Sequence, residues 1–230
     1  MISVFPQKLV KIKRKRVVQV KKGCTFVSNY LLNDMARKTT EIRQEEIKHA
    51  VLDIIYTDGL KNLSTHNLAK RIGMSEGSIF RHFPTKQDII LSIINDVQND
   101  FIGQLRNVSY SEGDPETRLK KFICATIEYL TANKGITMLV FSEASHNNDA
   151  ALKSQLQKIF NSQKELVSKI ILDGISMGTW DDQIQVENLA MLYMGIPVSL
   201  NIELILSGGE FHTDNYCNRM MQLMLKILKK

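Results

Sequence analysis

The segment from Thr65 to Pro84, THNLAKRIGMSEGSIFRHFP, constrains the fold more than any other stretch of this 230-residue chain. Gly73 follows a first helical stretch, at the place where a left-handed backbone is commonly required. Apolar side chains recur at helical spacing on both sides of this break, and we expect them to share one small core: Leu68, Ile72, Met74, Ile79 and Phe83. The pattern predicts two short helices joined by a sharp turn, a helix-turn-helix.

Residues with strong capping preferences mark the ends of both helices. Ser64 or Thr65 begins the first helix and Ser75 the second, and their side-chain oxygens can accept hydrogen bonds from free amides. Pro84 ends the pattern because it has no amide hydrogen to donate. The second helix leaves a short polar and aromatic surface, of the kind that meets base edges and phosphates: Glu76, Gly77, Ser78, Phe80, Arg81 and His82. This surface predicts DNA reading, with an ordinary helical corner as the alternative.

Residues 63–90, LSTHNLAKRIGMSEGSIFRHFPTKQDII, resemble the TetR family of bacterial transcriptional regulators. The resemblance is close over residues 39–88 and extends to the rest only as an all-helical pattern of suitable length. Family members often carry tyrosine where this chain has Phe80, which lacks a hydroxyl to donate to a phosphate. Arg37 and Lys38 would supply the short basic arm before the first helix. The resemblance implies phosphate contacts from Thr65, His82 and Lys86, and base or groove contacts from Glu76, Gly77, Ser78, Arg81 and His66.

The basic net charge of +6 is concentrated at the N-terminus. Residues 1–38 hold ten Lys or Arg and one Asp, a net +9, whereas residues 39–230 hold 20 basic and 23 acidic residues, a net −3. The first 34 residues have no helical period and precede Met35, so we expect them to be a disordered upstream extension from a mis-called start. The alternative is a polybasic arm that tracks phosphates in a salt-dependent way.

The sequence predicts an all-α fold with two folded parts after this basic extension. We expect a three-helix, helix-turn-helix DNA-binding domain over residues 39–85 and a larger effector-binding and dimerisation domain over residues 86–230. Helical periodicity and turn residues predict further helices over residues 85–107, 115–133, 135–145, 149–177, 185–207 and 214–229.

The most apolar stretch, residues 189–206, is barely long enough to cross a membrane. Gly195 and Pro197 interrupt it, and Asn201 and Glu203 lie near its end, so we expect no membrane partner. A helix apolar nearly all round is buried on several sides. We expect this helix and the last one to form a four-helix interface with a second copy of the chain. The resemblance implies the same homodimer, whose two heads would read a palindromic double-stranded DNA operator.

The resemblance also implies an apolar or amphipathic small-molecule effector, bound in the helical body, that releases a repressor from its operator. Activation is the open alternative. Methionine and aromatic residues at helical spacing are more often plain core, so the sequence offers only candidates for an effector pocket. These candidates are Met138, Phe141, Trp180, Met191 and Met194.

Two E-x-x-H pairs raise the alternative of a di-iron enzyme, because helical bundles of that class use two such pairs. Glu46 with His49 lies before the helix-turn-helix, and Glu143 with His146 lies at a helix end, so we expect no convergence and no metal site. The sequence has no nucleophile–base arrangement and no phosphate-cradling glycine loop, and we expect neither an enzyme nor a cofactor. A helix-turn-helix that binds only other proteins is a third possibility.

Cys24, Cys124 and Cys217 lie far apart in the sequence and form no C-x-x-C pair. We therefore expect neither a disulfide framework nor a cysteine zinc site. This cysteine usage fits a protein of the reducing cytoplasm.

Overall fold

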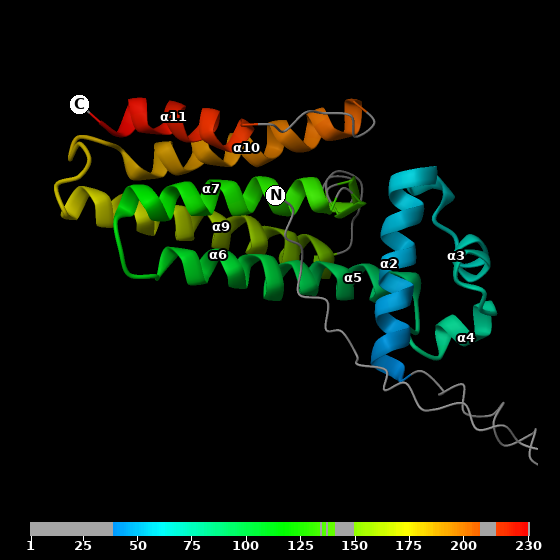
Figure 1. Cartoon of the computed structure of the whole chain (residues 1–230). Coiled ribbons are helices and arrows are strands. Elements are labelled where there is room, and N and C mark those ends of the chain that lie inside the picture. Colours follow the sequence, from blue (N-terminus) through cyan, green and yellow to red (C-terminus); the bar gives the residue numbers. More distant parts are fainter. Residues whose placement is uncertain (1–38, 134, 137, 141–149, 208–214, 230) are drawn as a thin grey trace, which may run out of the picture. The chain divides into compact units, whose positions relative to one another are not determined.

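The computed structural model describes residues 39–133, 135–136, 138–140, 150–207 and 215–229. Every regular element within these residues is helical, which confirms the all-α prediction (Figure 1). The elements are α2 (Thr40–Asp58), a 3₁₀ turn (Leu60–Asn62), α3 (Thr65–Ile72), α4 (Glu76–Phe80), α5 (Lys86–Asp96), a π-helical segment (Val97–Phe101), α6 (Ile102–Ser109), α7 (Pro115–Ala132), α9 (Ala150–Ser176), α10 (Val186–Leu206) and α11 (Tyr216–Leu228). Gly135, Ile136 and residues 138–140 are also helical.

Helices α3 and α4 form the predicted helix-turn-helix. Ser64 caps α3 by accepting a hydrogen bond from the amide of Asn67, and Ser75 caps α4 by accepting one from the amide of Ser78. Gly73 lies between them with a φ of 65°, in the left-handed region where glycine carries no Cβ penalty. The capping and turn predictions are confirmed.

The small core of this head contains most of the predicted side chains. Leu68, Ile79 and Phe83 are buried, whereas Ile72 and Met74 are half-buried. Helix α4 ends at Phe80 rather than continuing to Pro84. The residues after it form a turn in which the amides of His82 and Phe83 both donate to the Ile79 carbonyl.

The predicted single helix over residues 85–107 contains a π-helical segment. The amide of Ile102 donates to the carbonyl of Val97, five residues earlier, so one wide turn separates α5 from α6. Helix α5 begins with a capping box: the Thr85 hydroxyl accepts a hydrogen bond from the Asp88 amide, and the Asp88 carboxylate accepts one from the Thr85 amide. It packs against both α2 of the head and α9 of the body, and so joins the two regions.

The body is a bundle in which α6, α7, α9, α10 and α11 run lengthwise beside one another (Figure 1). Helix α7 packs against α6, α9, α10 and α11. Asp114 caps α7 by accepting a hydrogen bond from the Thr117 amide. Pro115 follows as the first residue of the helix, a position where its missing amide hydrogen costs no hydrogen bond. Helix α10 is long and apolar enough to span a membrane by length and composition alone. One face of this helix is buried in the bundle, including Tyr193 and Leu200.

The expectation of no disulfide is wrong. Cys124 on α7 and Cys217 on α11 form a disulfide bond with a Cα–Cα distance of 5.1 Å. The two residues are 93 positions apart in the chain, and sequence spacing gave no sign that α11 folds back onto α7. Cys24 lies outside the described residues.

Candidate nucleic-acid interface and ligand cavity

The side chains predicted to read DNA gather on and around α4. Glu76, Gly77, Phe80 and Arg81 are exposed, and Ser78 is half-buried. Phe80 is 44% exposed, which is unusual for an aromatic side chain that could have joined the adjacent core. The surface of α4 therefore combines a carboxylate, a guanidinium, a hydroxyl and an aromatic ring within one short helix and its cap.

Polar contacts arrange this surface in the DNA-free state. The Arg81 guanidinium donates to Ser78 Oγ at 2.7 Å, and Ser78 Oγ lies 2.9 Å from the hydroxyl of the helix cap Ser75. His66 on α3 lies 3.4 Å from the Glu76 carboxylate, which links the two helices of the motif. Arginine and serine are both side chains that hydrogen-bond base edges, so these internal contacts can be exchanged for contacts to DNA.

The predicted phosphate contacts lie at helix ends. Thr65 is the first residue of α3 and is half-buried, and Lys86 is the first residue of α5 and is exposed. The ring nitrogen Nδ1 of His82 is buried and has no hydrogen-bond partner among the described residues, so a phosphate contact would use Nε2. The predicted basic arm, Arg37 and Lys38, lies outside the described residues.

The body encloses a cavity of about 410 Å³, within the range of small-molecule sites. Its walls come from the π-helical segment, α7, the helical residues Ile136 and Val140, α9 and α10. The lining is mainly aliphatic and aromatic: Val97, Phe101, Thr126, Tyr129, Leu130, Ile136, Val140, Lys153, Leu156, Gln157, Ile159, Phe160, Gln163, Met194, Pro197, Val198 and Asn201.

A small number of polar groups reach this cavity. Lys153 is the only charged side chain among the lining residues that the structure describes. The amide oxygen of Asn201 is buried and has no hydrogen-bond partner among the described residues. Burial raises the pKa of Tyr129, and the carboxylates of Asp100 and Asp96 raise it further. The Tyr129 phenol therefore stays protonated and can donate a hydrogen bond.

A buried hydrogen-bond network supports the inner wall. The Thr126 hydroxyl donates to the Phe122 carbonyl at 2.9 Å, so Tyr193, 2.8 Å away, donates its own proton to Thr126. Gln163 donates to the Tyr193 oxygen at 3.0 Å. Burial raises the pKa of Tyr193, although the hydrogen bonds with Thr126 and Gln163 oppose this shift. Three helices are thereby held in register behind the cavity.

The five candidate effector residues do not lie together around this cavity. Met194 lines it. Trp180 is buried elsewhere, against Gly174, while Met138 is half-buried and Met191 is 53% exposed. Phe141 lies outside the described residues. The aromatic residues that do line the cavity have the same helical spacing as ordinary core residues, so sequence patterns offered no means of selecting them.

Two contacts connect the cavity region to the head. A Cβ on Gly135 would lie 2.4 Å from the carbonyl oxygen of Leu52 on α2, so glycine permits this close approach beside the lining residue Ile136. On the other side, Lys48 of α2 forms an ion pair with Asp96, the residue before the π-helical segment. Burial lowers the pKa of Lys48, but hydrogen bonds to Asp96 and Glu45 outweigh it and raise the pKa overall.

The di-iron alternative gains no support from the part of the chain that the structure describes. No group of three or more His, Cys, Asp or Glu in that part could hold a metal ion. Glu46 forms an ion pair with Arg43 at 2.9 Å. Glu143 and His146 lie outside the described residues.

Comparison with known proteins identifies relatives of the head and of the fold. Residues 49–93 match the family model of bacterial regulatory proteins, tetR family. The chain is 26% identical over 128 residues to the nucleoid occlusion factor SlmA of Actinobacillus pleuropneumoniae serotype 5b (strain L20), which covers 55% of this chain and 63% of that protein. The chain thus spans less than two thirds of the length of the curated relative that it matches.

Solved structures share the whole fold at low identity. The transcriptional regulator FadR from Bacillus subtilis in complex with stearoyl-CoA has a TM-score of 0.66 and 17% identity, covering 78% of this chain and 96% of that one. A protein from Saccharomonospora viridis in complex with choline has a TM-score of 0.70 and 18% identity, covering 83% and 100%. Residues 49–93 thus match the tetR family of bacterial regulatory proteins, and the helical fold of the chain is similar to those of the two solved structures.

Proposed function

We propose that this chain is a dimeric, sequence-specific DNA-binding transcriptional regulator of the cytoplasm, a repressor released from a palindromic operator by a small molecule. The observation that carries the proposal is the exposed polar surface of α4, with Glu76, Ser78 and Arg81, on a helix-turn-helix of the TetR family. Selection of bound duplexes from a random pool tests it. A recurrent palindromic motif is expected, whereas a pool without enrichment would contradict the proposal.

The exposed apolar face of α10 and α11 supports a homodimer. Both helices pack against α7 and leave large apolar side chains exposed by 40% or more: Met191, Leu192, Val198, Ile202, Leu206, Leu223 and Ile227. Exposed large apolar side chains gathered on two helices are typical of an interaction site. A second copy of this chain is the proposed occupant, because two helices from each copy would make a four-helix interface. The two heads would then read successive major grooves.

The cavity favours an amphipathic ligand with a hydrocarbon body and an anionic or hydrogen-bonding end. Its walls are mainly apolar, Lys153 supplies one positive charge, and Asn201 and Tyr129 supply polar atoms. The stearoyl-CoA complex of the similar FadR structure supports a fatty acyl ligand. A quaternary ammonium ligand such as choline is less favoured because the charged group among the described lining residues, Lys153, is a cation.

We expect Leu156→Trp to weaken binding of stearoyl-CoA by at least about tenfold, equivalent to about 1.4 kcal/mol. Leu156 lines the cavity and is half-buried, so the larger ring would occupy ligand space without entering a closed core. Isothermal titration measures the affinity. Leu172→Trp is the matched control, because Leu172 lies on the same helix, is 54% exposed and is not part of the lining. Equal affinities for Leu156→Trp and the wild type would place the ligand elsewhere.

Ligand binding would act on DNA through the two contacts between cavity and head. A ligand that prefers one spacing of the heads needs about 1–3 kcal/mol of differential affinity to weaken operator binding appreciably. The π-helical segment contributes Val97 and Phe101 to the cavity and directly follows Asp96, the partner of Lys48 in the head. Displacement of this segment would therefore alter how α2 is held.

A second candidate function comes from the relative SlmA, a nucleoid occlusion factor. The identity of 26% over 128 residues favours it as an alternative role for the same DNA-binding head. The two roles differ in their dependence on the cavity. Release of the selected duplex by an acyl ligand supports ligand-controlled transcription, whereas binding that no ligand relieves favours the alternative.

A further inference from the structure

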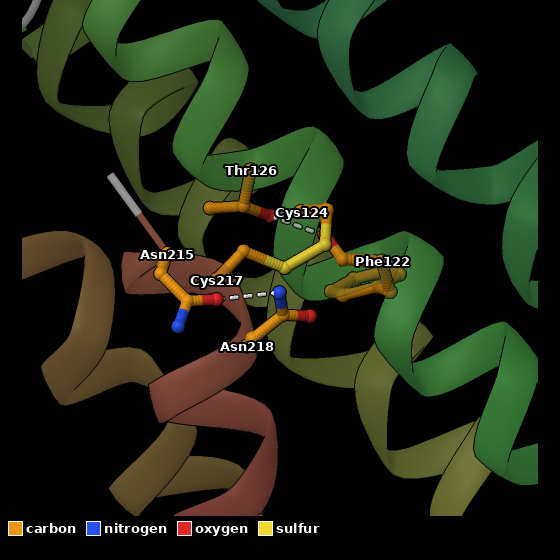
Figure 2. The surroundings of a disulfide bond; sticks show 6 residues. All are labelled: Phe122, Cys124, Thr126, Asn215, Cys217 and Asn218. Carbon is orange, nitrogen blue, oxygen red and sulfur yellow. Dashed lines mark hydrogen bonds between the residues drawn. A yellow bond between two sulfur atoms is a disulfide. The ribbon is translucent and has the colours of Figure 1, made fainter. Parts of the chain in front are cut away.

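We propose that Cys124 and Cys217 form a reversible, peroxide-sensitive disulfide that controls the first turn of α11. Figure 2 shows the bond between the two helices. Both residues are half-buried, so a small oxidant or reductant can reach them. The inference rests on the proposed DNA-binding function in one respect, because that function places the protein in the reducing cytoplasm. Disulfides of that compartment are usually transient, catalytic or redox-sensing rather than structural.

The start of α11 lacks a side-chain cap among the described residues. Its N-cap residue, Asn215, has a left-handed backbone with a φ of 59°, and its side chain makes no capping hydrogen bond to a backbone amide. The Asn215 side-chain oxygen instead accepts a hydrogen bond from the Asn218 side chain (Figure 2). Free amides at a helix start normally need such caps. Cys217 is the second residue of this turn, so the disulfide anchors the turn covalently to α7.

The far end of α11 is anchored without the disulfide. The amide of Asp181 donates to the Leu228 carbonyl at 3.1 Å, and Lys229 forms an ion pair with Glu116 at 2.7 Å. Met224 and Leu228 are buried. Opening the bond would therefore loosen the first turn of the helix while the C-terminal half stays packed.

The bond connects two surfaces of the proposed function. Cys124 lies two residues before Thr126, which lines the cavity and holds Tyr193. Helix α11 exposes Leu223 and Ile227 on the proposed dimer face. A closed disulfide fixes the N-terminal part of α11, up to Leu223, against α7 and presents a more ordered face to the second copy. Oxidation is thus expected to favour the dimer and reduction to weaken it, through Leu223 rather than through Ile227 in the packed C-terminal half.

The chemistry requires a two-electron oxidant, for which we name hydrogen peroxide. The thiolate of one cysteine attacks a peroxide oxygen, the O–O bond breaks, and a sulfenic acid and hydroxide form. The second thiolate attacks the sulfenic sulfur, the S–S bond forms and a second hydroxide leaves. The two thiol protons convert both hydroxides to water, so two thiols and one peroxide give one disulfide and two waters. A dithiol reductant reverses the bond by thiol–disulfide exchange.

Thiol counting on the full-length protein tests the chemistry without any DNA. The chain has three cysteines, so stoichiometric peroxide is expected to leave one alkylatable thiol per chain, with residues 124 and 217 cross-linked in non-reducing peptide maps. Dithiothreitol is expected to restore all three under native conditions. A bond that native dithiothreitol cannot open, or oxidation that cross-links Cys24 instead, would overturn the proposal.

Hydrogen exchange and sedimentation test the consequence. In a Cys24→Ser background, reduction is expected to speed amide exchange in residues 216–220 by at least about tenfold and to leave residues 224–228 unchanged. In sedimentation, the oxidised dimer is expected to dissociate only at lower protein concentrations than the reduced dimer. Cys217→Ser is expected to behave like the reduced protein under both conditions. Unchanged exchange in residues 216–220 would refute the switch. Thiol chemistry that works in a protein that binds no DNA would instead refute only the proposed function.

Discussion

Gly77→Glu should abolish sequence-selective DNA binding while leaving the protein folded. Gly77 lies on the exposed face of α4, and no atom lies within 4 Å of the position that its Cβ would take. The new carboxylate would face DNA phosphates and hold α4 away from the bases. Loss of two base contacts at about 1–3 kcal/mol each weakens binding by at least about 30-fold. Fluorescence anisotropy with the selected duplex measures the change.

A second glycine provides the control for this substitution. Gly103 lies on α6, far along the chain from the head, and its Cβ position is also free of contacts. Gly103→Glu is expected to bind DNA like the wild type, and both variants should unfold at similar temperatures. Retained selectivity in Gly77→Glu would mean that α4 does not read DNA.

Gly174→Val should destabilise the body by about 3 kcal/mol, the order of cost for losing a buried aromatic side chain. A Cβ at Gly174 would lie 2.1 Å from Cε3 of Trp180, and this indole is only 4% exposed. The carbonyl of Gly174 also accepts hydrogen bonds from the amides of Thr179 and Trp180, so backbone and ring are fixed together. For a chain of this size the melting temperature should fall by about 6–12 °C.

The same variant shows whether Trp180 is core or ligand site. Trp180 is the only tryptophan of the chain, so its fluorescence emission should shift to longer wavelength when valine displaces the indole. Gly103→Ala is the control, and we expect it to be neutral or to stabilise by up to about 1 kcal/mol through helix propensity. Unchanged stability and emission in Gly174→Val would contradict the packing described for Trp180.

The head could be predicted from the sequence because its signals are local. Ser64, Gly73 and Ser75 determine caps and a turn within a few residues of themselves, and neighbouring apolar residues build the core between the two helices. The expected all-α body was also correct, since helical periodicity needs no knowledge of distant contacts. The DNA contacts themselves stay predictions, because they depend on a partner.

The features that escaped prediction depend on tertiary packing. The disulfide needs α11 to lie on α7, and the cavity needs side chains from several helices to leave space between them. The π-helical segment at Val97–Phe101 adds one residue to a turn within an otherwise regular apolar stripe, so periodicity predicted a plain helix. Trp180 was predicted as a pocket residue because it is a large aromatic side chain. Its ring instead packs in the core, in the space left by the missing side chain of Gly174.

The most direct test of DNA reading by α4 compares the affinity of wild type and Arg81→Ala for the selected duplex and for single-base-pair variants of it, at several salt concentrations. Arg81 is exposed just after α4, where its guanidinium donates a hydrogen bond to Ser78 Oγ. We expect Arg81→Ala to lose about 1–3 kcal/mol of discrimination at particular base pairs and to keep most of its nonspecific affinity. Equal affinity and equal base preference in the two proteins would contradict the account.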